Sequence, residues 1–139
     1  MTELLHRIKV FVFSIQEREP HYLLMRASLP ESLWGPIQGS IGFGEKLESA
    51  IRREVMDDVG LGRPLDLIDL QLPARWLVGD EEVIEWSFGF RTHNEPPPLS
   101  LSKRWAEARW AYFSKAYPTL ELEGDRAAIM RLHALLHAA

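Results

Sequence analysis

The chain has 139 residues, which is enough for one domain with its own hydrophobic core. Hydrophobic residues make up 46% of it and charged residues 26%, the balance of a folded globular protein, so we predict a single domain over residues 1–139. The absence of cysteine excludes disulfide bonds and thiolate metal sites, and the net charge of −4 argues against general nucleic-acid binding.

Hydrophobic periodicity and turn residues divide the chain into strands and helices. In chain order we predict a strand at residues 8–15, its hairpin partner at 22–26, a helix at about 46–59, strands at 65–72, 82–91 and 108–113, and a helix from Asp125 nearly to the end. A turn at Gly79 and Asp80 is expected before the strand at 82–91. The last helix has a buried stripe of small and aliphatic residues, with Asp125 as its expected N-cap.

The order of these elements predicts the fold class. The first strand is apolar on both faces apart from Lys9 and Ser14, which is typical of a central strand in a covered sheet. Strands precede, surround and follow one central helix, and a second helix closes the chain. We therefore predict an α/β (α+β) fold in which a mixed β-sheet lies between helices.

The predicted helix at residues 46–59 carries acidic residues on its apolar side. Residues three and four apart share a helix face, and the stripe expected to face the core runs through Leu47, Ala50, Ile51, Glu54, Asp57 and Asp58. Like charges at these spacings repel by roughly 0.2–0.5 kcal/mol per pair even on an exposed helix. The helix dipole and partial burial disfavour the same carboxylates.

A divalent cation would offset all three of these costs. Hard cations such as Mg²⁺ take carboxylate oxygens as ligands and keep water or substrate phosphates in their other positions. The helix is therefore interpreted as the floor of a metal and phosphate site, with Mn²⁺ as an alternative to Mg²⁺. The other interpretation is a solvated acidic helix end that Arg52 and Arg53 neutralise in part.

A fixed spacing of glycine, acidic and arginine residues extends over the 23 residues from Gly39 to Leu61. Its defining positions are Gly39, Glu45, Arg53, Glu54, Val55, Asp57, Asp58, Gly60 and Leu61. This pattern resembles the Nudix box, in which Gly, Glu, Arg-Glu-hydrophobic, Glu-Glu and Gly-hydrophobic occur at the same spacings. The acidic pair departs from that motif, because Asp57 and Asp58 stand where the family usually has glutamate, and each is shorter by one methylene.

The resemblance to the Nudix hydrolase (MutT-like) superfamily implies a Nudix fold and cleavage within the phosphate chain of a nucleoside diphosphate linked to another group. It implies metal ligands at Glu54, Asp57, Asp58 and the backbone carbonyl of Gly39. It also implies that Arg53 orients a neighbouring carboxylate, with Glu45 as its structural partner. A plain helix-N-terminal glutamate is the alternative for Glu45, and Gly60 is expected to end the helix.

Outside the box, the chain loosely resembles the bacterial dihydroneopterin triphosphate (dATP) pyrophosphohydrolase branch of the family. The resemblance rests on residues 100–113, on Trp34 ahead of Gly39, and on the region that begins at Asp125. It makes Glu107 our candidate general base, with a solvated surface glutamate as the alternative. Arg104 departs from the branch, which tends to have an acidic residue there.

Two further residues are candidates for substrate binding. Trp34 has a ring that can stack on a base or pterin, and Arg26 can meet a phosphate. The alternatives are a core-edge tryptophan and a solvated strand end.

These patterns predict a Mg²⁺-dependent pyrophosphohydrolase that acts on a nucleoside triphosphate or a pterin triphosphate. One alternative is a dinucleoside polyphosphate or nucleotide-sugar hydrolase, because specificity lies in loops outside the box. Another is a non-catalytic nucleotide-binding or sensor module, which the aspartate pair and Arg104 suggest. No long apolar run or leader is present, so we expect a cytoplasmic protein with no membrane or nucleic-acid partner, and the sequence leaves a homodimer open.

Overall fold

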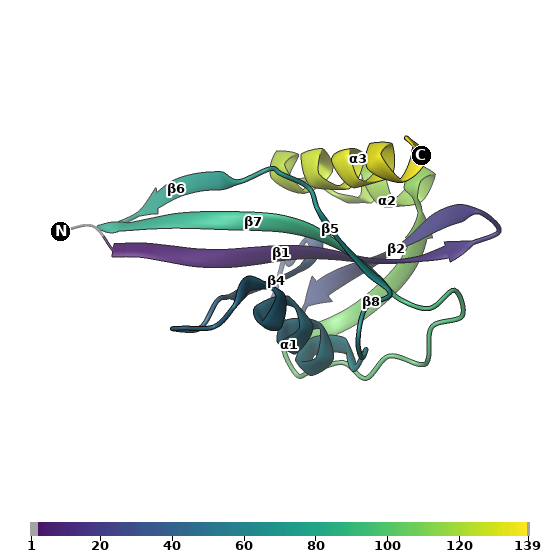
Figure 1. The fold of residues 1–139 in the computed structure, drawn as a ribbon, viewed down its shortest axis with the longest axis horizontal. Helices are drawn as coiled ribbons and strands as arrows, with labels where there is room; N and C mark the ends of the chain where they lie inside the picture. Colours follow the sequence, from purple (N-terminus) through teal and green to yellow (C-terminus); the bar gives the residue numbers. More distant parts are fainter. Residues whose placement is uncertain (1–2, 139) are drawn as a thin grey trace.

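The structure is a computed structural model that describes residues 3–138 (Figure 1). Its strands are β1 (Glu3–Gln16), β2 (Glu19–Ala27), β3 (Trp34–Gly35), β4 (Ile37–Ser40), β5 (Asp66–Asp69), β6 (Ala74–Val78), β7 (Glu81–Arg91) and β8 (Trp105–Tyr112). Its helices are α1 (Leu47–Val59), α2 (Phe113–Thr119) and α3 (Glu123–His137). Over these residues, no helix is both long enough and apolar enough to span a bilayer.

The strands form one mixed, 8-stranded sheet around β1. One edge of β1 pairs in parallel with β7, which also pairs with β5 and β6. The other edge has two antiparallel partners in succession, because residues 7–10 pair with β4 and residues 13–16 pair with β2. The sheet therefore forks along β1, with β4 on one branch and β2, β3 and β8 on the other.

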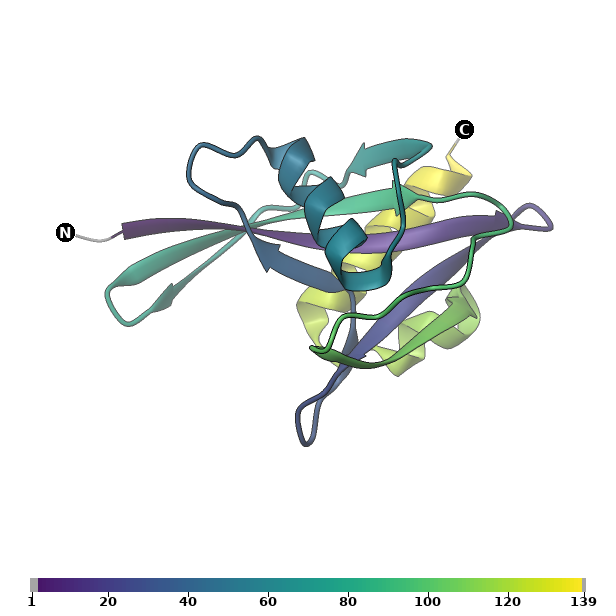
Figure 2. The same cartoon turned by 90° about the horizontal axis from the view of Figure 1, so that it is seen from below.

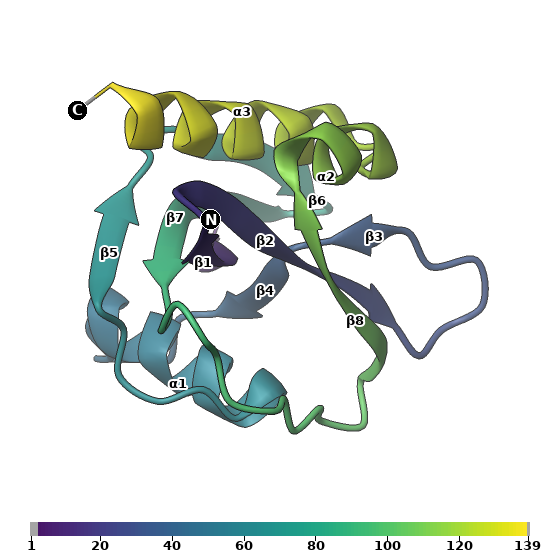
Figure 3. The same cartoon turned by 90° about the vertical axis from the view of Figure 1, so that its right-hand side faces the viewer.

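Helices cover both faces of this sheet, α1 on one side and α2 with α3 on the other (Figure 3). Alternate residues of β1 supply the two cores, because successive side chains of a strand point to opposite faces. Val10 and Val12 lie in the core that includes α1, whereas Phe11 and Phe13 lie in the core that includes α3. The predicted mixed sheet between helices is confirmed.

The helices and strands differ from prediction mainly in where they begin and end, and in short strands that were not predicted. β1 begins at Glu3 rather than at residue 8, and the predicted strand at 65–72 is shortened to β5. β3 and β4 are two and four residues long, too short for a repeating pattern to show. Helix α2 contains Pro118, which sequence reasoning treats as a helix breaker.

A buried group of charges lies on the α3 side of β1. The Lys9 ammonium is 2.8 Å from a carboxylate oxygen of Asp125 and 3.4 Å from one of Glu85, and all three side chains are less than 10% exposed. The expectation that Asp125 caps the helix is wrong, because α3 begins at Glu123 and Asp125 lies inside its first turn. Lys9 therefore fixes the start of α3 to the central strand.

We predict that Lys9→Met destabilises the protein by about 3–5 kcal/mol, because it leaves the buried Asp125 carboxylate without its cation and Glu85 with only Arg7, at 4.0 Å. Urea denaturation of the wild type and the variant measures this difference. Lys103→Met, at an exposed position, is the matched control and is expected to change stability by less than about 0.5 kcal/mol. Equal effects of the two changes would contradict the role given to Lys9.

Candidate active site

Helix α1 ends in two aspartates, an arrangement that helix electrostatics disfavour. Its last turn holds no basic residue, and the C-terminal end of the helix dipole repels negative charge. Two backbone amides satisfy carbonyls there, since the N–H of Ser100 donates to Val59 at 2.9 Å and the N–H of Ser102 donates to Asp58 at 3.0 Å. The segment between β7 and β8 therefore docks on the end of α1 (Figure 2).

The Asp58 carboxylate points inward from this helix end and is only 4% exposed. One of its oxygens accepts a hydrogen bond from the Ser102 hydroxyl at 3.2 Å. The other accepts from Nη2 of Arg104 at 2.6 Å. Both oxygens of this buried charge are therefore satisfied by residues of the docked segment.

Glu54 lies one turn earlier on the same side of α1, and its side chain is 14% exposed. One carboxylate oxygen accepts from Nη1 of Arg53 at 2.9 Å, and the other lies 3.8 Å from Nη2 of Arg104. A Cβ atom on Gly39 would overlap this carboxylate, so glycine allows Glu54 to lie directly against β4. Glu54 and Asp58 thus converge on one cationic nitrogen.

Asp57 does not join them. It is exposed on the solvent side of α1, whose buried residues are Ala50, Ile51, Val55, Asp58 and Val59. Across residues 3–138, no three acidic or histidine side chains lie together in a group that could hold a metal ion. The structure therefore brings together two of the three carboxylates considered from the sequence.

Arg53 is braced by the loop that precedes α1. Its Nε and Nη2 atoms donate to the two carboxylate oxygens of Glu45 at 2.8 and 2.9 Å, and Nη2 also donates to the Ser40 carbonyl at 3.0 Å. The Arg53 guanidinium and the N–H of Gly42 hold the pKa of Glu45 down to about 2, and Glu45 raises the pKa of Arg53 in turn. This pair fixes the nitrogen that Arg53 presents to Glu54.

The donor set suits a hard divalent cation. Glu54 and Asp58 offer carboxylate oxygens to one point, and the missing Cβ of Gly39 lets Glu54 lie against β4 there. Mg²⁺ typically takes one or two protein carboxylates and fills its other positions with water and phosphate oxygens. Glu54 and Asp58 are therefore the residues suited to hold it, and the β4 carbonyl that the structure places at the same point is that of Gln38. The Gly39 carbonyl stays a sequence-based candidate, and Asp57 reaches the point only if its side chain turns inward.

Glu107, Arg26 and Trp34 lie together on a different face. Arg26 and Glu107 are register partners on β2 and β8 and form an ion pair. Register partners project to the same face, and β2 alternates, so both lie on the side of Leu24 rather than that of Met25, which belongs to the α1 core. Glu107 therefore does not meet the carboxylates of α1.

Trp34 is the centre of that second group. The guanidinium carbons of Arg109 and Arg26 lie 4.7 and 5.9 Å from its ring centroid. Sequence reasoning missed Arg109 because its position over the ring depends on the pairing of β8 with β2. It also missed Ser102, which has no motif of its own.

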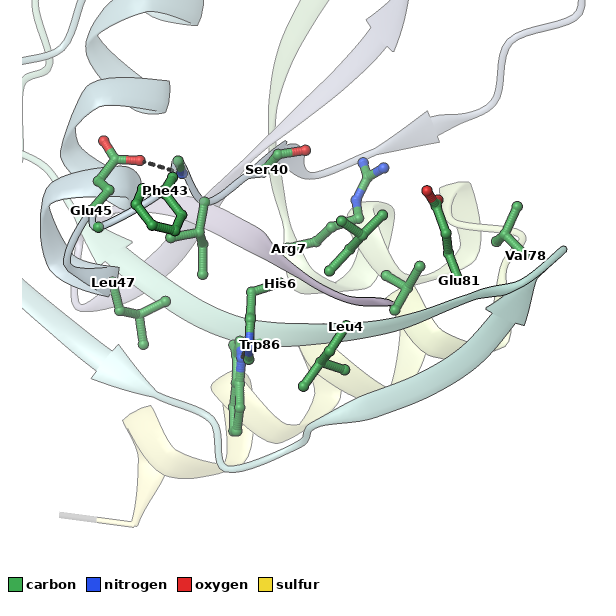
Figure 4. A pocket seen from close by; sticks show the side chains of 15 residues that line it. Leu4, His6, Arg7, Ser40, Phe43, Glu45, Leu47, Val78, Glu81 and Trp86 are labelled. Carbon is green, nitrogen blue, oxygen red and sulfur yellow. Dashed lines mark hydrogen bonds between the residues drawn. The ribbon is translucent and has the colours of Figure 1, made fainter. Parts of the chain in front are cut away.

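A cavity of about 800 Å³ lies beside the loop that precedes α1 (Figure 4). Its walls come from the first half of β1, the segment before α1 and the β6–β7 hairpin, and they include Leu4, Phe43, Glu45, Leu47, Val78 and Trp86. Neither Glu54 nor Asp58 lines it. The cavity therefore does not mark the cation-binding point, although the two share the loop that holds Glu45.

The domain model of the Nudix family, described as "NUDIX domain", matches residues 5–132. The chain therefore belongs to the Nudix family, whose hydrolases act on pyrophosphate bonds and generally use divalent metals. A comparison with curated proteins finds no match.

Solved structures with the same fold include a putative Nudix hydrolase from Listeria monocytogenes, with a TM-score of 0.81, 18% identity, and coverage of 94% of this chain and 93% of that one. An Ap4A hydrolase from C. elegans has a TM-score of 0.77, 16% identity, and coverage of 97% and 99%. The E. coli dihydroneopterin triphosphate pyrophosphohydrolase has a TM-score of 0.77, 17% identity, and coverage of 94% and 95%. At these identities the likeness shows the fold alone.

We predict that Glu45→Gln lowers the melting temperature, and that the loss depends on pH. The pKa of Glu45 is about 2 in the folded protein and 4.5 as an ordinary carboxyl, so its stabilising effect is complete above about pH 5 and disappears as the pH falls through 2. Melting curves of the wild type and the variant should therefore converge toward pH 2. Glu48→Gln, in the first turn of α1, is the control, and a gap that stays constant with pH would contradict this assignment.

Proposed function

We propose that this Nudix domain is a Mg²⁺-dependent pyrophosphohydrolase that cleaves within the phosphate chain of a nucleoside triphosphate or a pterin triphosphate. The observation that supports this most directly is the convergence of Glu54 and Asp58 on one cationic position beside Gly39. That position suits Mg²⁺, and Mn²⁺ shares its ligand preferences. The substrate is a small molecule, and the protein works without a nucleic-acid or membrane partner.

Each residue of the box has a role in this proposal. A bound divalent cation supplies Lewis-acid stabilisation of the phosphate charge and lowers the pKa of water. In this proposal Glu54 and Asp58 hold the cation, and Asp57 stays on the solvent side of α1. Arg53 keeps one rotamer of Glu54, because its guanidinium is itself fixed by Glu45.

The group around Trp34 is proposed to bind the ring end of the substrate. Because it lies on the opposite face of the sheet from Glu54 and Asp58, this proposal requires the substrate to pass an edge of the sheet between its phosphates and its ring. An aromatic ring with two guanidiniums beside it offers both a stacking surface and positive charge for phosphate oxygens. The ion pair with Glu107 fixes Arg26 in place. In this proposal Glu107 is a positioning residue for substrate binding, and its face of the sheet argues against its use as the general base.

Two alternatives rest on particular observations. The similarity in fold to an Ap4A hydrolase supports a dinucleoside polyphosphate substrate, and a nucleotide sugar belongs to the same alternative. The contact of Arg104 with Asp58 and the outward position of Asp57 support a non-catalytic nucleotide-binding or sensor domain. Calorimetry that detects nucleotide binding without hydrolysis would favour the sensor.

The proposed activity is tested by phosphate and pyrophosphate release from a panel of nucleoside triphosphates, dihydroneopterin triphosphate, dinucleoside polyphosphates and nucleotide sugars with Mg²⁺. We expect turnover in one of the first two classes and a fall in kcat of at least about 100-fold in Glu54→Gln, because the variant keeps the size of the side chain but loses a charged ligand. Glu48→Gln on the same helix should retain wild-type activity. No turnover on any substrate by the folded protein would overturn the proposal.

We predict that Glu107→Gln raises KM by about three- to tenfold and changes kcat by less than about threefold, because it frees Arg26 without touching the reacting atoms. Steady-state kinetics on the best substrate of the panel measures both constants. Loss of a general base would instead lower kcat by about 10²–10⁴-fold. A fall in kcat of that size would restore Glu107 as the base.

A further inference from the structure

Arg104 occupies the position where the two carboxylates of α1 converge. Its Nη2 atom lies 2.6 Å from Asp58 and 3.8 Å from Glu54, and it also donates to the backbone carbonyl of Gln38. Gln38 directly precedes Gly39 on β4, so oxygens from α1 and β4 surround one nitrogen. We propose that Arg104 is a resident counter-ion of the metal site, which a divalent cation must displace in order to bind.

The contacts of Arg104 differ from those of an ordinary surface ion pair. Asp58 is buried, and a buried carboxylate without a partner is strongly unfavourable. Arg104 supplies that partner and reaches Glu54 as well. The guanidinium also lies over the ring of Trp105, 4.6 Å from its centroid, which adds a cation–π contact.

The backbone of this segment and the side chain of Arg104 are held independently. Ser100 and Ser102 anchor the segment to the end of α1 through backbone amides, contacts that do not involve the arginine side chain. That side chain is 45% exposed, whereas that of Asp58 is 6% exposed. Arg104 can therefore leave toward solvent while the segment remains docked.

A divalent cation would displace Arg104 for two reasons: both need the same carboxylate oxygens, and both are positively charged. A cation bound to Asp58 and Glu54 takes the oxygens that Arg104 now contacts. A guanidinium and a doubly charged ion repel each other strongly at such separations. Metal binding therefore competes with an internal ion pair, so the apparent affinity for Mg²⁺ is lower than the carboxylates alone would give.

This inference rests on the proposed metal site and is tested by measuring Mg²⁺ affinity directly, by titration calorimetry without substrate. Arg104→Gln is expected to bind Mg²⁺ about tenfold more tightly than the wild type, because a charge-assisted contact no longer competes. Its melting temperature without metal should be lower than that of the wild type, and Mg²⁺ should raise it by more. Arg104→Lys, which keeps the charge, is expected to stay close to the wild type in affinity.

Lys103→Gln is the matched control, since it removes the same charge from the neighbouring position and should leave Mg²⁺ affinity unchanged. If Arg104→Gln binds Mg²⁺ no more tightly than the wild type, while Glu54→Gln binds it more weakly, the inference is overturned and the metal site stands. If Mg²⁺ binds to none of these proteins, or binds unaffected by Glu54→Gln, both the inference and the proposed metal site are overturned. Circular dichroism confirms that each variant is folded.

Discussion

The site depends on how the chain neutralises two neighbouring carboxylates, one of which is almost fully buried. Asp58 is withdrawn from water and Glu54 lies beside it, so both burial and mutual repulsion disfavour the pair. The chain meets each of them with its own arginine, Arg53 from the same helix and Arg104 from the segment between β7 and β8. Each arginine is held beside its carboxylate by further contacts of its own side chain.

These supporting contacts explain why the site needs residues distant in the sequence. Glu45 and the Ser40 carbonyl fix Arg53 from the loop before α1. Ser100 and Ser102 bring the other segment to the end of the helix by satisfying carbonyls that a helix leaves free. The backbone amides that satisfy the last carbonyls of α1 therefore also bring the guanidinium of Arg104 to the site. The stability of the helix end and the electrostatics of the site have a common origin.

The sequence was sufficient to predict α1, because its apolar period is regular and Gly60 ends it in a left-handed conformation. The resemblance to the Nudix box also implied the pairing of Arg53 with Glu45, which the structure contains. The sequence did not separate Asp57 from Asp58, because both fall within the broad stripe assigned to the core side. The two positions point about 100° apart, and the orientation of the helix on the sheet decides which of them is buried. Nor could the sequence place Glu107, whose face is decided by the register of β8 against β2, a long-range pairing that leaves no local pattern.

The outward position of Asp57 has a chemical consequence. A third carboxylate turned into the site would add one negative charge opposite the phosphates of an anionic substrate, and repulsion between like charges would weaken substrate binding. If a cation binds as proposed, only Glu54 and Asp58 face it, and more of its charge is left for phosphate oxygens. In the structure Arg53 and Arg104 balance these two carboxylates. In the proposed site, the outward position of Asp57 therefore shifts charge balance from protein ligands to substrate rather than removing the site. The replacement of glutamate by aspartate leaves the charge of each position unchanged.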